Sequence, residues 1–157
     1  MATIKKKPSG YGQFGGFSPY GNVTALAFFL ATNASGDVID SDTTVAVASG
    51  DVIDLGELPE GMRLDDAQIL IKTGMTATVT GSLGFKYVDG DSTEVPQDAA
   101  YFINAGDLAT AGRLRANTGK LVTLPKAARL ILTTGGAANA KASDIKVIVS
   151  GELTGPR

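Results

Sequence analysis

From residue 22 onward the chain is a succession of short apolar segments separated by turn residues. The clearest segments are residues 22–32, 64–72, 82–88, 127–134 and 144–153. In the last one apolar and polar residues alternate, which is the period of a strand with one buried face. About eight such segments, roughly one every 8–12 residues, predict an all-β fold: an antiparallel β-sandwich, jelly-roll-like, of short strands.

Residues 22–32 differ from the other segments because both of their faces are apolar. Val23 and Phe29 belong to one face, and Leu26 and Leu30 to the other. Such a strand is either central in a packed sheet or in contact with a partner subunit. The pattern leaves both alternatives open.

Turn chemistry is clear at two places. The heptapeptide Ala-Ser-Gly-Asp-Val-Ile-Asp occupies residues 34–40 and again residues 48–54. In each copy we expect a Ser-Gly-Asp turn that leads into a Val-Ile strand, with an extended stretch between the copies. Farther on, Pro59-Glu-Gly61 predicts a type II turn in which Gly61 takes a positive φ.

Two further stretches have less regular patterns. Residues 76–80 read Thr-Ala-Thr-Val-Thr, and this alternation of β-branched residues predicts a strand. Residues 94–118 are the least strand-like part of the chain. We expect a short helical turn or strand within residues 94–103 and a loop over residues 105–118.

A glycine-rich aromatic segment precedes the strands. Tyr11, Phe14, Phe17 and Tyr20 fall at every third position of residues 8–21, which also hold five glycines and two prolines. Glycine and proline disfavour regular structure here, and aromatic side chains are the main anchors of interfaces. We therefore expect an extended N-terminal arm that orders on a neighbouring subunit or another protein. The alternative is an arm that packs over its own domain.

The predicted domain organisation is an arm over residues 1–21 and a β-sandwich over residues 22–157. The arm is basic: Lys5, Lys6 and Lys7 are its charged residues, whereas the whole chain has a net charge of −2. A basic arm on an acidic body favours an acidic partner, which includes another copy of the body. Alternatively, the lysines only solvate the chain terminus.

Composition excludes several function classes. The chain has no His and no Cys, which removes Ser-His-Asp triads, thiol nucleophiles and Cys-ligated metal sites. We expect no enzyme, no catalytic residue, no cofactor and no metal site. An enzyme that uses only carboxylates, Lys or Tyr is the remaining catalytic alternative. A single basic triplet predicts no nucleic-acid binding, and no apolar run approaches the ~20 residues that span a membrane.

Acidic clusters raise a calcium alternative. Asp89, Asp91 and Glu94 lie in one short turn, but the third acidic position and terminal bidentate glutamate of a calcium loop are missing. A solvated hairpin turn is favoured. Residues 37–54 hold a second cluster, where turn formation explains the aspartates without ions. Asp65 and Asp66 are adjacent, so on a regular strand they would point to opposite faces and not cooperate as acid and base.

Residues 52–64, Val-Ile-Asp-Leu-Gly-Glu-Leu-Pro-Glu-Gly-Met-Arg-Leu, resemble a turn-to-strand segment of small tailed-bacteriophage head proteins. Residues 105–113 and the strand segments 129–134 and 145–151 are similar to the same group, so the resemblance covers roughly residues 50–151. The resemblance implies a capsid decoration, or cement, protein. Such a protein has a β-sandwich body, binds the capsid exterior and clamps neighbouring major capsid subunits.

On this resemblance we expect a structural virion protein on the capsid exterior, present in the host cytoplasm during assembly. Its partners would be the major capsid protein and copies of itself, with a trimer favoured over a dimer. The arm matches no motif of the group, and physical reasoning alone assigns its partner-binding residues: Lys5, Lys6, Lys7, Tyr11, Phe14, Phe17 and Tyr20.

The alternative function is a receptor- or carbohydrate-binding β-sandwich module of a phage tail or an adhesin. That module would use loops 89–96 and 135–143. The absence of Trp disfavours it, since sugar rings commonly stack on aromatic faces.

Overall fold

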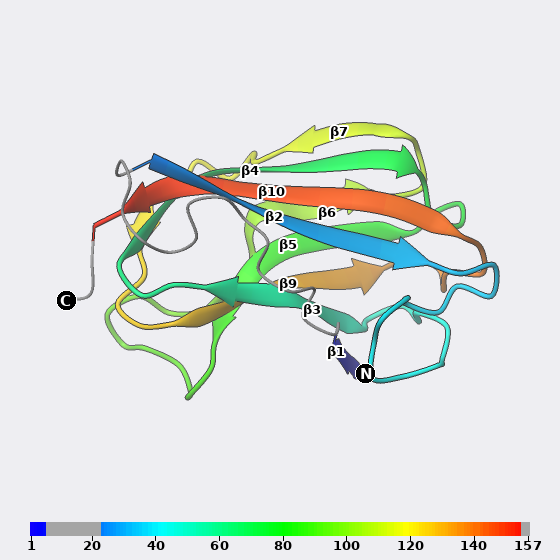
Figure 1. Cartoon of the computed structure of the whole chain (residues 1–157), viewed down its shortest axis with the longest axis horizontal. Helices are drawn as coiled ribbons and strands as arrows, with labels where there is room; N and C mark the ends of the chain where they lie inside the picture. Colours follow the sequence, from blue (N-terminus) through cyan, green and yellow to red (C-terminus); the bar gives the residue numbers. More distant parts are fainter. Residues whose placement is uncertain (6–22, 155–157) are drawn as a thin grey trace.

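The computed structural model describes residues 1–5 and 23–154, which form two packed β-sheets (Figure 1). The first sheet has the strand order β1 (Thr3–Lys5), β3 (Val52–Leu58), β9 (Ala128–Gly135), β5 (Thr80–Tyr87) and β6 (Asp98–Asp107). The second has the order β2 (Val23–Thr32), β10 (Ser143–Leu153), β4 (Met62–Thr73) and β7 (Gly112–Arg115), and β8 (Val122–Thr123) also pairs with β4. The described residues contain no helix long and apolar enough to cross a membrane.

The strand order is that of a jelly roll. Without β1 and β8, one sheet reads β3-β9-β5-β6 and the other β2-β10-β4-β7, so the chain repeatedly passes from one sheet to the other. All pairs within these two four-stranded sheets are antiparallel, and only the short strand β1 pairs in parallel, with β3. The predicted antiparallel, jelly-roll-like sandwich is therefore confirmed.

The core lies between the two sheets. Along β10, Ile145, Val147 and Val149 are fully buried, as the alternation predicts. Across the core, β5 contributes Leu83 and Phe85 to the same apolar cluster. At the end of β3 the chain turns as predicted, and Gly61 has a φ of 74°. Burial of alternate side chains from both sheets accounts for the stability of the fold.

Two predicted strands are absent. Residues 76–79 form a turn instead of a strand, and Thr78 takes a φ of 69°. This turn packs against the β9–β10 connection, where Gly136 would collide with the Thr78 carbonyl if it carried a Cβ. The first copy of the heptapeptide also forms no strand: Val38 makes only an isolated bridge to Thr32, whereas Val52 of the second copy begins β3.

The region predicted to be least regular contains two strands. β6 pairs with β5 along one edge of the first sheet, and β7 pairs with β4 along one edge of the second. The expected loop over residues 105–118 was therefore wrong. The β5–β6 register shifts at two places, and Ala105 takes a φ of 48°, so the sequence pattern is interrupted where the ladder is irregular.

The two ends of the sandwich carry different loops. The Thr32 end, where β2 ends, carries the loops over residues 33–51, 74–79 and 136–142. The Val23 end, where β2 begins, carries the loops over residues 59–61 and 88–97 and the connection over residues 116–127, which contains β8.

Candidate functional site

Of the sequence-predicted partner-binding residues, the structure describes Lys5. Lys5 is exposed in β1, where its backbone N–H donates to Asp42 Oδ1 at 3.0 Å and its carbonyl accepts from the Asp42 N–H at 3.0 Å. The preceding residue, Ile4, is buried in the core. The remaining predicted residues lie outside the described part of the chain: Lys6, Lys7, Tyr11, Phe14, Phe17 and Tyr20.

Lys5 and Val23, the described residues that flank positions 6–22, are far apart in the fold. β1 lies beside the loop that follows β2, since Asp42 bonds to Lys5 and Ile39 bonds back to Ala31 near the end of β2. Val23 lies at the other end of β2, which is roughly 30 Å long at the usual rise of a strand. The connection between Lys5 and Val23 therefore joins opposite ends of the sandwich.

The structure excludes one of the two interpretations of residues 22–32. β2 is an edge strand, not a central one, and Leu26 and Leu30 face the core while the opposite face of the strand looks outward. Val23 is 76% exposed and Phe29 53% exposed. With neighbours on β10 and β4 these residues form an apolar surface, called here the outer face: Val23, Ala25, Ala27, Phe29, Leu70 and Ile148.

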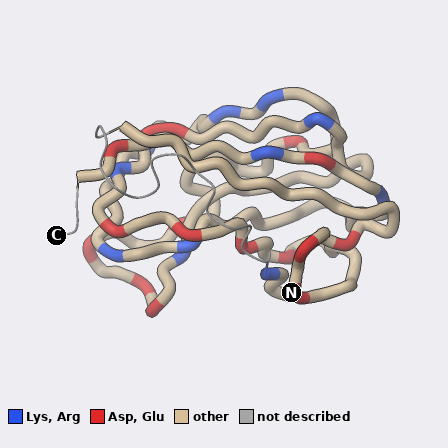
Figure 2. Tube along the Cα trace, in the orientation of Figure 1, with Lys and Arg blue, Asp and Glu red and all other residues tan. Residues whose placement is uncertain are grey.

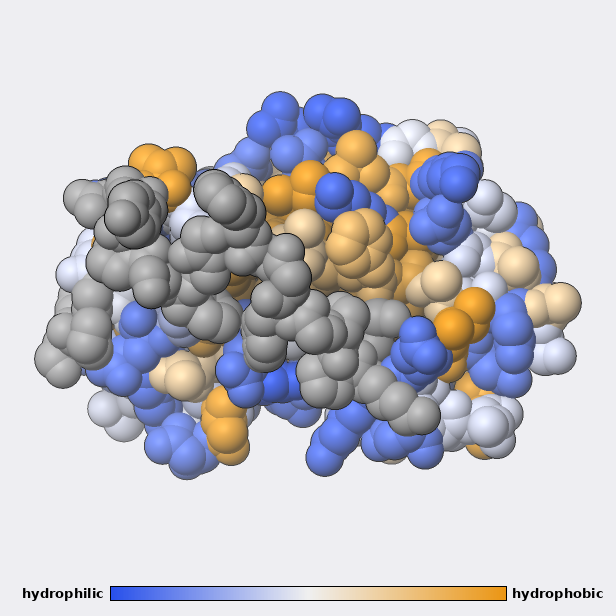
Figure 3. Space-filling model, viewed as in Figure 1, coloured by the Kyte–Doolittle hydropathy of each residue, from blue (hydrophilic) through white to orange (hydrophobic). Residues whose placement is uncertain are grey.

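Basic side chains lie within and beside the outer face. The register places Phe29, Lys146, Leu70 and Arg113 in one row across β2, β10, β4 and β7. The Lys146 ammonium lies over the Phe29 ring, 5.2 Å from its centroid. In Figure 3, hydrophobic residues gather over β2 and β10 in the middle of the view. Figure 2 shows basic residues along β7, β4 and β10 above them.

Acidic residues gather at the Thr32 end, where they organise the loop over residues 33–51. The buried Asp51 carboxylate accepts from the Ala2 N–H at 3.0 Å and from the Ala48 N–H at 2.9 Å. Asp42 accepts from the Lys5 N–H, as described above. Asp40 is exposed and takes a φ of 58°. These aspartates act as turn and strand acceptors, the role that the sequence favours over ion binding.

The acidic turn between β5 and β6 is likewise held by its own chain. Asp91 Oδ1 accepts from the N–H groups of Gln97 (2.7 Å) and Ser92 (2.8 Å), and these bonds lower the pKa of Asp91. Asp89 pairs with Lys126 at 3.0 Å, and this hydrogen bond and charge lower the pKa of Asp89. The Lys126 ammonium also lies over the Tyr87 ring at 5.0 Å. The arrangement is that of an internally bonded turn.

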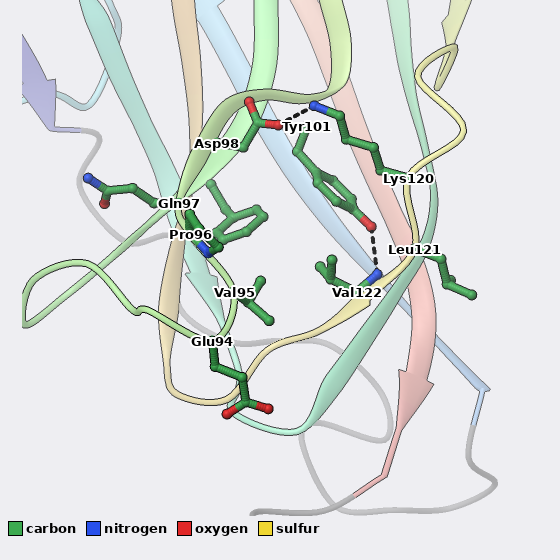
Figure 4. A pocket seen from close by; sticks show the side chains of 10 residues that line it. Glu94, Val95, Pro96, Gln97, Asp98, Tyr101, Lys120, Leu121 and Val122 are labelled. Carbon is green, nitrogen blue, oxygen red and sulfur yellow. Dashed lines mark hydrogen bonds and ion pairs between the residues drawn. The ribbon is translucent and has the colours of Figure 1, made fainter.

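A cavity of about 510 Å³ opens at the Val23 end, between this turn and residues 120–122 (Figure 4). Phe85, Val95 and Val122 are among its apolar lining residues. Tyr101 projects into it, and its hydroxyl donates to the Leu64 carbonyl at 3.2 Å.

The polar groups of the cavity are already engaged. Besides donating to Leu64, the Tyr101 hydroxyl accepts from the Val122 N–H at 3.0 Å, and burial raises the pKa of Tyr101. The Lys120 ammonium bonds to the Asp98 carboxylate at the rim. Burial acts to raise the pKa of Asp98, but the bonds from Lys120 and Ala100 lower it overall. This lining suits an apolar side chain of a partner better than acid–base chemistry.

The two loops proposed for carbohydrate binding do not form one site. β5 and β9 pair Tyr87 with Ala128 at one end of the ladder and Thr80 with Gly135 at the other. Residues 89–96 follow the first end and residues 135–143 the second. They lie at opposite ends of the sandwich.

The pair Asp65–Asp66 corrects one sequence inference. A bulge in β4 opposite Ser150 and Gly151 leaves Leu64 and Ala67 both buried, and both aspartates lie on the solvent side. The prediction of opposite faces was wrong, because a bulge breaks the two-residue period. Each carboxylate pairs with a different arginine, Asp65 with Arg63 and Asp66 with Arg115.

Sequence reasoning missed the cavity and most of the outer face. The two-sided apolar pattern of residues 22–32 did indicate the β2 part of that face. Leu70 and Ile148 join it only through strand order, since β10 and β4 lie beside β2. Tyr101 belongs to a segment whose pattern left helix and strand undecided.

The chain matches no protein-family model and no curated protein sequence. Among solved structures it is similar to a chain of the capsid of Ralstonia phage GP4, with a TM-score of 0.68 and 17% identity over 98% of this chain and 99% of that chain. A chain of the cyanophage Pam1 capsid asymmetric unit gives a TM-score of 0.54 and 15% identity, covering 94% and 97% of the two chains. The acidic stable capsid of Helicobacter pylori bacteriophage KHP30 contains a chain with a TM-score of 0.52 and 14% identity, covering 85% and 91%. At these identities the likeness shows a shared fold.

Proposed function

We propose that the protein is a structural component of a phage virion that binds the capsid exterior and clamps neighbouring major capsid subunits. The main support for this proposal is that the chain has a fold similar to that of a phage capsid chain, across nearly the full length of both chains. The other two similar chains also come from phage capsids. The described residues offer apolar and paired polar surfaces, as a non-enzymatic binding protein requires.

The proposed mechanism is burial of surface at many identical lattice sites. A contact of modest affinity becomes persistent when each molecule engages two capsid subunits at once. We propose that the predicted arm residues, which include Tyr11, Phe14, Phe17 and Tyr20, supply apolar anchors for this contact. Lys5 in β1 and Val23 in β2 are the described residues that flank these arm positions.

The remaining parts of the proposal concern partners and place. The partners are the major capsid protein and copies of this chain, with a trimer favoured, and nucleic acid and membranes are not partners. The protein reaches the capsid exterior from the host cytoplasm during assembly. A receptor- or carbohydrate-binding role is less well supported, because the two loops it would use lie at opposite ends of the sandwich.

The test replaces the four arm aromatics by Ser in the full chain, which leaves β1 in place. Capsid binding is measured by co-sedimentation with expanded heads that lack this protein. We expect at least a tenfold weaker affinity with an unchanged unfolding midpoint. A matched control replaces Val88, an exposed apolar residue at the Val23 end, by Ser. Wild-type protein that does not bind heads would refute the function, and arm variants that bind like the wild type would refute the role of the arm.

A further inference from the structure

We propose that the outer face is the docking site for the acidic loop, residues 37–45, of a second copy of this chain. The contact is head to tail: the side of one sandwich receives the Thr32 end of the next. This rests on the self-association included in the proposed function and names its contact surfaces, in the free protein without any capsid.

The receiving surface combines exposed apolar area with unpaired positive charge. Phe29 is about half exposed, Lys146 lies between it and Leu70 across the sheet, and Ile148 is the next outward-facing residue of β10. Among the ion pairs of the described residues, none involves Lys146, which lies within this apolar area, or Arg113, which lies at its edge. An exposed apolar area with a charged border is the composition of an interface core and its rim.

The docking loop has the complementary composition. Residues 33–51 contain four aspartates and no Lys or Arg. Within the loop, Val45 is 67% exposed and Ile39 44% exposed, and Asp40 is exposed beside Ile39. The loop therefore presents apolar side chains together with negative charge. Figure 2 shows this acidic loop at the opposite side of the molecule from the basic strands.

The acidic loop of one copy does not occupy the outer face of the same copy. The loop packs beside β1 through Asp42 and Lys5, at the end of the sandwich, whereas Phe29, Ile148 and Leu70 face outward from the second sheet. Two surfaces with opposite charge and different positions on one body join copies heterologously. Such contacts are made reciprocally across a two-fold axis, close into rings of three or more copies, or extend into filaments.

The test is a charge exchange in the full-length chain. The variants are Arg113→Glu, Asp40→Lys and the combination of both, with Lys86→Glu as a matched lysine reversal on β5 of the other sheet. Mass in solution is measured by light scattering and sedimentation velocity across micromolar concentrations, and circular dichroism checks folding. A further variant, Phe29→Ser, tests the apolar part.

We expect the wild-type protein to form rings, with three copies as the favoured number. Each single charge variant and Phe29→Ser should associate at least tenfold more weakly. The Arg113→Glu/Asp40→Lys combination should recover association, and Lys86→Glu should match the wild type. A wild-type monomer, or single variants that associate normally, would overturn the proposal. Capsid binding is not part of this assay, so a failure of this contact is distinguishable from a failure of capsid binding.

Discussion

Replacement of Asn139 by Ala should destabilise the protein by about 3 kcal/mol. Asn139 is 1% exposed and joins three segments at the Thr32 end. Its Oδ1 accepts from the Thr76 N–H at 3.0 Å and from the Thr76 hydroxyl at 3.2 Å. Its Nδ2 donates to Thr32 Oγ1 at 3.0 Å and to the Lys141 carbonyl at 2.9 Å.

The size of this destabilisation depends on which hydrogen-bond partners of Asn139 keep other hydrogen bonds after the replacement. The Thr32 hydroxyl still donates to the Lys141 carbonyl, and the Thr76 hydroxyl still accepts from the Ala140 N–H. The Thr76 N–H loses its acceptor. Each lost bond costs about 1 kcal/mol net, and a buried donor left without a partner costs about 1–3 kcal/mol. For a domain of this size, about 3 kcal/mol corresponds to a fall of about 6–12 °C in Tm.

The assay is urea and thermal unfolding followed by circular dichroism, since the chain has no Trp for fluorescence. Protein concentration is held constant, because association would shift the midpoint. Asn104→Ala, an exposed Asn on β6, is the matched control and should cost under about 0.5 kcal/mol. Hydrogen exchange at the Thr76 amide should accelerate only in the Asn139 variant. Equal stability of the two variants would refute the network as a source of stability.

Two further predictions concern charge. Arg129→Ala should lower the free energy of unfolding by about 3 kcal/mol, because the Asp54 carboxylate, which is 7% exposed, loses the Arg129 Nε that lies 3.0 Å from both of its oxygens. Arg63→Ala removes a more exposed pair and should cost under about 1 kcal/mol by urea unfolding. Equal costs for the two variants would contradict the argument from burial. The pKa of Asp98 is lower in the folded state than its ordinary value of 3.8, so its pairing with Lys120 stabilises the fold above that pH and is lost as pH falls through the folded pKa. As the pH falls below the ordinary value of 3.8, Asp98→Asn should therefore lose less stability than the wild type, and parallel pH profiles would exclude the pairing.

The local signals in the sequence were reliable where neighbours in the chain decide the structure. The alternation of Ile145, Val147 and Val149 predicted a buried strand face, and Gly61 adopts the positive φ that its turn requires. The signals failed where distant contacts decide. Thr78 belongs to a β-branched run, yet its segment turns because it packs on the β9–β10 connection.

By itself, the sequence determined that the chain is a β-sandwich without His or Cys chemistry, because a two-residue period and residue types are local properties. Only the tertiary structure decided which strands are neighbours. The placement of β2 at an edge turned its second apolar face outward beside β10 and β4, and the parallel pairing of β1 with β3 placed Lys5 at the opposite end of the sandwich from Val23. The physical reason is that strand pairing joins residues far apart in the chain, and the same alternating pattern fits an edge or a central position equally well.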